Sequence, residues 1–343
     1  MIRLNNFVWF LKMLFVTNRV LQEGPTPVNP DGSFTLPRQI HFDLANNQAE
    51  QSVYFCQRND DNNYVEIGNR AFFSALKESR AQQILFYMHG YSSLPEPAIF
   101  PKARELQRLF DQKAEGYVQV VPVIWPCDND FGAVKDYYDD QIAADASDIA
   151  YARLFEKFLR WREGNSTLDD PCTKPINILA HSMGNRVLRG AIARTIQYFQ
   201  PQGFPLIFRN IFMTAADVSN NTLDFGQDGE FIAHSTRNVV VYFAGDDLAM
   251  RASKVANMSV TARRMGHTGP ERMDKVSRNV FALDCGDFNN VYDNPTGHGY
   301  FASDQNGNPG LAFDHIWSCV ARGRVPMEPA NGRIMILRTR FWQ

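Results

Sequence analysis

The sequence has few cysteines, no long apolar stretch and no excess of charge of one sign. Its five cysteines are widely scattered and include no C-x-x-C pair: Cys56, Cys127, Cys172, Cys285 and Cys319. This spacing fits neither a disulfide framework nor a zinc site, and it favours a reducing, cytoplasmic location. No stretch approaches the roughly 18 uninterrupted apolar residues that a membrane-spanning helix requires. We therefore expect no integral membrane segment.

The charged residues nearly balance. With 35 basic and 37 acidic residues, the formal net charge is -2, so nothing would draw the protein onto a phosphate backbone. We expect no nucleic-acid partner. Ligand spacings such as H-x-x-x-H and H-E-x-x-H are missing, as are G-x-G-x-x-G and phosphate-loop motifs. We therefore expect neither a metal nor a cofactor, and the sequence leaves the oligomeric state open.

The first residues superficially resemble a signal peptide. Lys12, however, interrupts the apolar run, and no A-x-A-like cleavage site follows it. We interpret this segment as leading into a buried strand near Phe15.

Short apolar runs rich in β-branched residues alternate with longer amphipathic segments. This alternation is typical of a mainly parallel sheet covered by helices on both faces, an α/β architecture. The predicted strands are 83–88, 118–125, 176–180, 208–214, 238–244 and 279–283. Apolar residues at helical spacing predict crossover helices over 102–113 and 141–161.

Nothing in the sequence marks a second domain, since we find neither an internal repeat nor a low-complexity linker. Residues 59–63 (NDDNN) indicate a turn after a segment that contains 53–56. We expect one domain over 1–343, with antiparallel edge strands in about 1–65 and a core in about 80–325.

The strongest chemical signal is residues 176–184, INILAHSMG, where a short apolar strand leads directly into small-x-Ser-x-Gly and then an amphipathic helix. This pattern is typical of a nucleophile elbow, with Ser182 as the nucleophile. The turn is tight, so small residues must flank it, and Ala180 and Gly184 meet that need. His181, between them, is interpreted as a packing residue.

A second strand ends in His89-Gly90, well before the predicted nucleophile. Such a turn can supply an oxyanion donor, because glycine lets the backbone approach a substrate closely. The predicted donors are the backbone N–H groups of Tyr91 and Met183, and each is typically worth roughly 3 kcal/mol of transition-state stabilisation. The alternative is that His89 and Gly90 merely close a turn.

In this kind of site the order along the chain is serine, then acid, then histidine, so the acid should lie at the end of a strand that follows the nucleophile. Asp246 and Asp247 come directly after the predicted strand 238–244, and Asp217 follows 208–214. A carboxylate there would orient a histidine and stabilise its protonated form. Asp247 ranks first and Asp217 is the reserve.

The candidate bases after the acid are His267, His298 and His315. His298 lies in a glycine-rich loop after the last predicted strand, where a turn can carry an imidazole over the strand ends. His315 fits a packed helix, and His267 precedes the last strand. We predict His298 as the general base.

Several of these segments together resemble a family of bacterial α/β-hydrolases, esterase- or lipase-like, that is catalogued as a domain of unknown function. The resemblance covers most of the chain and rests on LFVTNR (14–19), YMHGY (87–91), VIWP (123–126), LAHSMGN (179–185), AADV (215–218) and GHGYF (297–301). The family's acid pattern matches residues 242–250, which implies Asp247 and not Asp246. Met250 and Gly299 depart from the family's usual leucine and serine.

These observations predict a serine hydrolase. It would cleave a carboxylic ester or related small acyl substrate through an acyl-enzyme at Ser182, with His298 as base and Asp247 as orienting acid. An acyltransferase could use the same three residues. A hydrolase fold that serves only as a binding module is the alternative from a different class.

Overall fold

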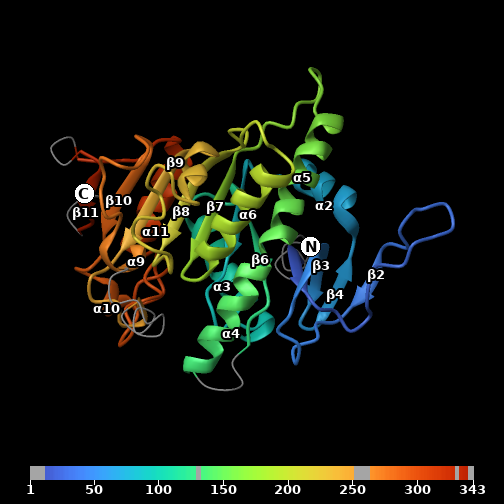
Figure 1. Ribbon diagram of the computed structural model, residues 1–343, viewed down its shortest axis with the longest axis horizontal. Helices are drawn as coiled ribbons and strands as arrows, with labels where there is room; N and C mark the ends of the chain where they lie inside the picture. The colour runs from blue at the N-terminus through green and yellow to red at the C-terminus, as the bar shows by residue number, and fades with distance from the viewer. Residues whose placement is uncertain (1–11, 129–132, 251–262, 329–331, 339–343) are drawn as a thin grey trace, which may run out of the picture.

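A computed structural model describes residues 12–128, 133–250, 263–328 and 332–338 (Figure 1). One sheet of 11 strands runs through it, in the order β11-β10-β9-β8-β7-β5-β6-β1-β3-β4-β2. The strands are β1 (Met13–Arg19), β2 (Arg38–Ile40), β3 (Ala49–Asp60), β4 (Asn63–Glu66), β5 (Gln83–Met88), β6 (Val118–Ile124), β7 (Ile176–His181), β8 (Phe208–Thr214), β9 (Thr236–Phe243), β10 (Val280–Asp284) and β11 (Ile334–Ile336).

The sheet has an antiparallel end and a parallel remainder. Strand β1 pairs antiparallel with β3 and parallel with β6, and β3 and β2 pair antiparallel with β4. All pairs from β6 to β11 are parallel. Phe15 is fully buried in β1, which confirms the predicted strand near it. The antiparallel strands near the N-terminus are confirmed too, although β1 lies inside the sheet and not at its edge.

Helices cover both faces of the sheet, and their apolar sides form two cores. They are α2 (Gly68–Glu78), α3 (Phe100–Lys113), α4 (Ala133–Ala146), α5 (Asp148–Asn165), α6 (Gly184–Tyr198), α7 (Glu230–His234), α9 (Met265–Thr268), α10 (Asn289–Tyr292), α11 (Leu311–Arg322) and the π-helix η1 (Pro95–Ile99). One core is formed with α2, α5 and α6, and the other with α3 and α11. Each helix in the described part of the chain is too short or too polar to cross a membrane.

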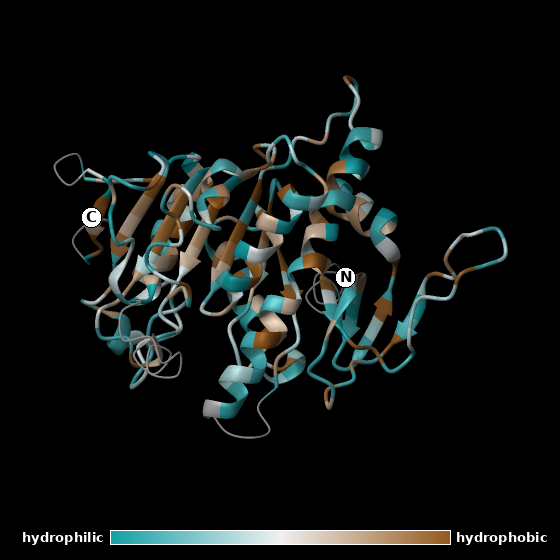
Figure 2. Ribbon diagram, viewed as in Figure 1, coloured by the Kyte–Doolittle hydropathy of each residue, from teal (hydrophilic) through white to brown (hydrophobic). Residues whose placement is uncertain are grey.

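Strand β5 shows how the two cores arise. All six of its residues are buried, and Phe86 faces the first core while Leu85 faces the second, because successive side chains of a strand point to opposite faces. In Figure 2 the central strands are accordingly hydrophobic, while the covering helices also carry hydrophilic residues. The α/β fold with a mainly parallel sheet is confirmed.

The single helix predicted over 141–161 is wrong, because the structure has two helices, α4 and α5, that meet at Ser147. The Ser147 side chain is fully buried, and its hydroxyl donates to the carbonyl oxygen of Ala143 (2.8 Å) and accepts from the Asn18 amide (2.9 Å). Serine competes with the helix for its backbone hydrogen bonds in this way. The break therefore depends on a contact between residues far apart in the sequence.

Candidate functional site

The predicted residues meet at the carboxyl ends of β5, β7, β8 and β9. These strands are in parallel register, with Met88 opposite Ala180 and Thr214 opposite Tyr242. The loops after them therefore emerge side by side at one edge of the sheet, where ligand sites of open α/β sheets are found.

Ser182 occupies the turn between β7 and α6. Its φ is +52°, in the left-handed region that non-glycine residues rarely adopt, and its side chain is buried. Two backbone hydrogen bonds hold this conformation: the Ser182 N–H donates to the Thr214 carbonyl (2.9 Å), and the Asp217 N–H donates to the Ser182 carbonyl (3.1 Å). Strain of this kind persists only where the surroundings fix it, and it is concentrated at functional sites.

Two glycines, Gly184 and Gly90, lie in closely packed positions around Ser182. A Cβ atom at Gly184 would lie 2.6 Å from the His89 carbonyl oxygen, closer than real contacts allow. A Cβ atom at Gly90 would lie 3.1 Å from both the Ser182 Cβ and the His181 Nδ1. The turn after β5 therefore lies directly against the serine, as the sequence predicts.

His298 and Asp247 form a close pair. The His298 Nδ1 lies 2.7 Å from the Asp247 Oδ2, and the aspartate is completely buried. Its other oxygen, Oδ1, accepts a hydrogen bond from the Met250 N–H (3.0 Å). Both carboxylate oxygens are thus engaged, which fixes the orientation of the imidazole and favours a proton on Nδ1.

The other two aspartates lie elsewhere. Asp246 accepts a hydrogen bond from the Asn290 amide. The carboxylate of Asp217, the reserve acid, accepts from the Tyr137 hydroxyl (2.7 Å) and lies 3.1 Å from the Arg264 Nε. Of the three aspartates considered, Asp247 is the one that the structure pairs with His298.

A further carboxylate, which the sequence analysis did not single out, shapes the histidine loop. The Asp293 Oδ2 accepts hydrogen bonds from the Thr296 hydroxyl (2.7 Å) and from the N–H groups of His298 (2.8 Å) and Gly299 (2.6 Å). Burial alone would raise the pKa of Asp293, but these hydrogen bonds outweigh it and lower the pKa. Asp293 therefore positions His298.

His181 links the serine turn to the histidine loop. Its Nε2 lies 3.2 Å from the His298 carbonyl oxygen, and the two imidazole rings are 4.7 Å apart. Its other side packs on Phe301 (4.6 Å between ring centroids). Burial, together with the neighbouring His298, lowers the pKa of His181 well below its usual value, so the ring is neutral. The residue next to Ser182 thus contacts His298 directly.

The His298 Nε2 atom is buried and has no hydrogen-bond partner among the described residues. No hydrogen bond joins it to the Ser182 hydroxyl. Hydrogen bonds of this kind are often long without a substrate and tighten when one binds. Asp247 therefore holds the Nδ1 atom of His298, while the Nε2 atom on the other side of the ring has no partner in the described part of the chain.

The two predicted oxyanion donors belong to Met183, the residue after the serine, and to Tyr91, the residue after Gly90. Among the backbone hydrogen bonds of the described residues, neither the Tyr91 N–H nor the Met183 N–H is engaged. The next residue, Ser92, has a φ of +53°, and its N–H donates to the Asp140 Oδ2 (2.7 Å). The Asp140 Oδ1 accepts from the Asn47 amide (2.9 Å) and from the Asp128 N–H (3.0 Å). Asp140 on α4, which the sequence analysis also missed, therefore anchors the loop that carries Tyr91.

His89 has a structural role. Its Nε2 accepts from the Trp125 N–H (3.2 Å), its Nδ1 donates to the Gly90 carbonyl (2.8 Å), and its ring stacks on the Trp125 indole at 4.9 Å. Burial lowers its pKa to about 3, so it stays neutral. These bonds fix the turn against which Ser182 packs.

The remaining two candidate histidines lie in helices. His315 is fully buried in α11, and its Nδ1 lies 2.8 Å from the Tyr242 hydroxyl. This confirms the interpretation of a packed helix residue. His267 lies in α9. Among the described residues, no group of three or more His, Cys, Asp or Glu side chains is arranged to hold a metal ion.

Comparison with known families assigns the chain to one of them. The family model described as "Alpha/beta hydrolase of unknown function (DUF900)" matches residues 67–309. The chain belongs to this family. Membership agrees with the suspected resemblance and with the observed fold, and it supports a hydrolase in general. A search of curated proteins finds no match.

Proposed function

We propose that this member of the DUF900 family is a serine hydrolase that cleaves carboxylic esters or related acyl compounds, with Ser182 as nucleophile, His298 as general base and Asp247 as orienting acid. The observation that carries the proposal is the buried Asp247–His298 pair, 2.7 Å apart, next to a serine held at a φ of +52°. A carboxylate that holds an imidazole in this tautomer leaves the opposite nitrogen free to accept a proton.

The first half of the reaction would acylate the serine. The His298 Nε2 removes the proton of the Ser182 hydroxyl as Oγ attacks the acyl carbon. Negative charge develops on the former carbonyl oxygen, and the N–H groups of Met183 and Tyr91, which make no backbone hydrogen bond in the described part of the chain, would stabilise it. The imidazolium, stabilised by Asp247, then gives its proton to the leaving alcohol, whose bond to the acyl carbon breaks.

The second half would repeat these steps with water. His298 removes a proton from water, the resulting hydroxide attacks the acyl carbon, and the acid leaves as the Ser182 Oγ regains a proton. An acyltransferase would differ only here, since an alcohol, amine or thiol would replace water.

Hydrolysis of p-nitrophenyl esters of graded acyl chain length tests the proposal. We expect turnover by the wild-type protein and its loss in Ser182→Ala. Product analysis with added alcohol or amine acceptors separates hydrolysis from transfer, because transfer would yield the new ester or amide instead of the free acid. A Ser182→Ala variant with full esterase activity would refute the proposal.

A further inference from the structure

A cleft opens at the amino-terminal edge of the sheet, away from Ser182. It lies between α2, α5 and the first residues of β5 and β7, and its empty volume is about 500 Å³ including the part open to solvent. Ile84 and Ile176, near the starts of β5 and β7, are among its lining residues. Since Ser182 follows the other end of β7, about 20 Å of extended chain separates it from the cleft. The cleft is therefore separate from the candidate catalytic site.

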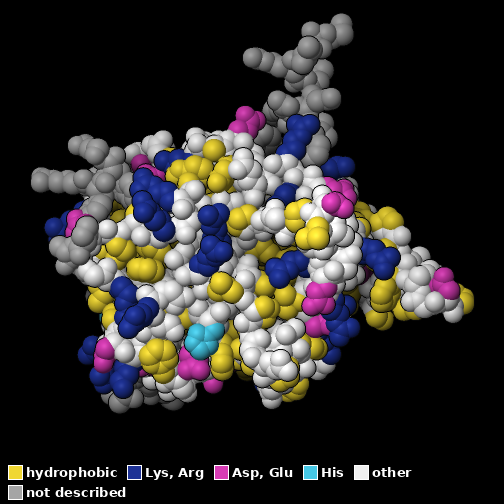
Figure 3. All heavy atoms as spheres, turned by 90° about the horizontal axis from the view of Figure 1, so that it is seen from above, with side chains coloured by type: hydrophobic (Ala, Val, Ile, Leu, Met, Phe, Trp, Pro, Cys, Tyr) yellow, Lys and Arg dark blue, Asp and Glu magenta, His cyan; other side chains and the backbone are white. Residues whose placement is uncertain are grey.

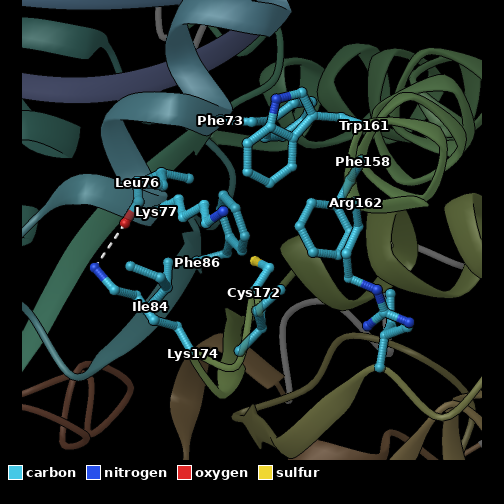
Figure 4. Close-up of a pocket in the computed structure, with 12 residues that line it drawn as sticks. Phe73, Leu76, Lys77, Ile84, Phe86, Phe158, Trp161, Arg162, Cys172 and Lys174 are labelled. Carbon is cyan, nitrogen blue, oxygen red and sulfur yellow. Dashed lines mark hydrogen bonds between the residues drawn. The ribbon is translucent and has the colours of Figure 1, made fainter. Parts of the chain in front are cut away.

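Aromatic side chains make up much of its wall. Figure 4 shows the rings of Phe73, Phe86, Phe158 and Trp161 around the cleft, with the sulfur of Cys172 near them. Flat aromatic walls of this kind can pack against an unbranched alkyl chain that follows the space between the rings.

Three cationic side chains also line the cleft, namely Lys77, Arg162 and Lys174, whereas none of the described residues that line it is acidic. Lys77 forms an ion pair with the exposed Asp170 (2.5 Å). Figure 3, which looks down on this edge of the sheet, shows Lys and Arg side chains spread over the face, with some Asp and Glu side chains among them. Within the cleft itself, the walls are mostly apolar and the charged residues that line it are positive.

Two of the three cations have no carboxylate partner among the described residues. The Lys174 ammonium donates to the carbonyl oxygens of Leu76 (2.9 Å) and Ser79 and to the Ser79 hydroxyl, all of them neutral acceptors. The Arg162 guanidinium makes neither a hydrogen bond nor an ion pair with any residue in the described ranges, and the residue is only half-buried. Its planar fork of donors matches a carboxylate.

The same three cations also affect the pKa of the Cys172 thiol, which lines the cleft. Burial raises the pKa of Cys172, while Lys77, Arg162 and Lys174 act in the opposite direction by favouring its anionic form. The three cations therefore offset part, but not all, of the effect by which burial disfavours a negative charge at this point of the cleft.

We propose that this cleft binds an amphiphile with an unbranched alkyl chain and a single carboxylate head. The chain lies against the aromatic walls, where it is removed from water, and the head meets Arg162 and the lysines at the mouth. The proposal is independent of the proposed catalytic activity, because it concerns the opposite edge of the sheet.

Cys172 provides a readout confined to the cleft. The other four cysteines are completely buried, so iodoacetamide should alkylate Cys172 first. We expect sodium decanoate, kept below its micelle-forming concentration, to slow alkylation of Cys172 as measured by peptide mass spectrometry. Decyltrimethylammonium, which has the same chain and a positive head, should protect it much less. Equal protection by both heads, or no protection by decanoate, would overturn the proposal.

Arg162→Gln tests the contact with the head group, and Arg160→Gln on the same helix is the matched control. Arg160 is 80% exposed, pairs with Glu156 and does not line the cleft. We expect Arg162→Gln to raise the half-protecting decanoate concentration by up to about fivefold, the upper end of the range for a partly exposed ion pair. Arg160→Gln should leave it unchanged. Identical behaviour of the two variants would contradict the proposal. Ser182→Ala should retain the protection, which keeps this test separate from that of the catalytic proposal.

Discussion

The two edges of the central sheet are built in different ways. At the carboxyl edge, buried hydrogen bonds position the candidate catalytic residues: both oxygens of Asp247 are engaged, and Ser182 is held in a left-handed conformation. At the amino edge, the walls are mostly apolar, and the Arg162 guanidinium is half-buried without a partner in the described chain. Buried hydrogen bonds of the first kind fix a geometry, which chemistry requires. An apolar cleft with an unpaired cation at its mouth needs only to match a ligand in shape and charge, which suits binding.

Ser182→Ala should show the largest difference between the two edges, because it should abolish ester turnover and leave ligand binding in the cleft unchanged. If the serine is the nucleophile, its removal should lower kcat by about 10⁴- to 10⁶-fold, by analogy with other serine hydrolases. Protection of Cys172 by decanoate should not change. Turnover of a p-nitrophenyl ester and the alkylation assay, run on the same preparation, measure the two effects.

Asp247→Asn should have the next largest effect. An amide can no longer hold the protonated His298, and the corresponding change in known triads costs about 10⁴-fold in kcat. Asp246→Asn is the matched control, because the carboxylate of Asp246, the residue next to Asp247, contacts Asn290 instead of His298. Comparable losses in the two variants would contradict the assignment of the acid.

Asp293→Asn should reduce kcat by up to about a hundredfold, because residue 293 loses the negative charge that strengthens its three hydrogen bonds to the loop that positions His298. It should also change the pH dependence of stability. The pKa of Asp293 is lowered in the folded protein, so its contribution is present above the usual aspartate pKa of about 4 and is lost as the pH falls through the folded value. The stability gap between wild type and variant should therefore narrow below about pH 4. Thermal unfolding across pH 2.5 to 7 measures it, and a gap that is constant with pH would argue against this role.

Asp140→Ala should cost about tenfold in kcat, less than the loss of a whole oxyanion donor, because it loosens the Tyr91 loop without removing the N–H. Asp139→Ala changes the same charge one residue away and should have little effect. Equal rates for Asp140→Ala and wild type would show that the anchor is not needed.

The smallest effect on catalysis should come from Arg162→Gln. We expect an unchanged kcat for ester hydrolysis and a stability within about 0.5 kcal/mol of wild type, since the side chain has no partner in the described chain to lose. Ester assays and thermal unfolding check both values. A substantial loss of activity would mean that the two edges are coupled.

The central strands could be predicted from the sequence because their signals are local: apolar runs mark β5 to β10. The expected order of serine, acid and histidine, together with the family resemblance, pointed to Asp247 and His298, which the structure brings together. The short strand β11 was missed because three residues carry no periodicity. The break at Ser147 was missed because it depends on Asn18, which is distant in sequence.

The two anchoring carboxylates differ in how far they could have been found. Asp140 lies in a helical pattern, where it cannot be told from a solvated residue, and its partners Asn47 and Ser92 are remote. Asp293 precedes a Pro-Thr-Gly-His segment, and an aspartate before such a turn often bonds nearby backbone N–H groups. That signal was present in the sequence.

Reaction with a fluorophosphonate tests the central claim most directly, because the reagent marks an activated serine whatever the natural substrate is. Intact mass and peptide mapping would be compared for wild type, Ser182→Ala and His298→Ala. We predict one adduct on Ser182 in wild type, none in Ser182→Ala and strongly slowed labelling in His298→Ala. Wild-type protein that is folded yet unlabelled, or labelled at another serine, would contradict the account.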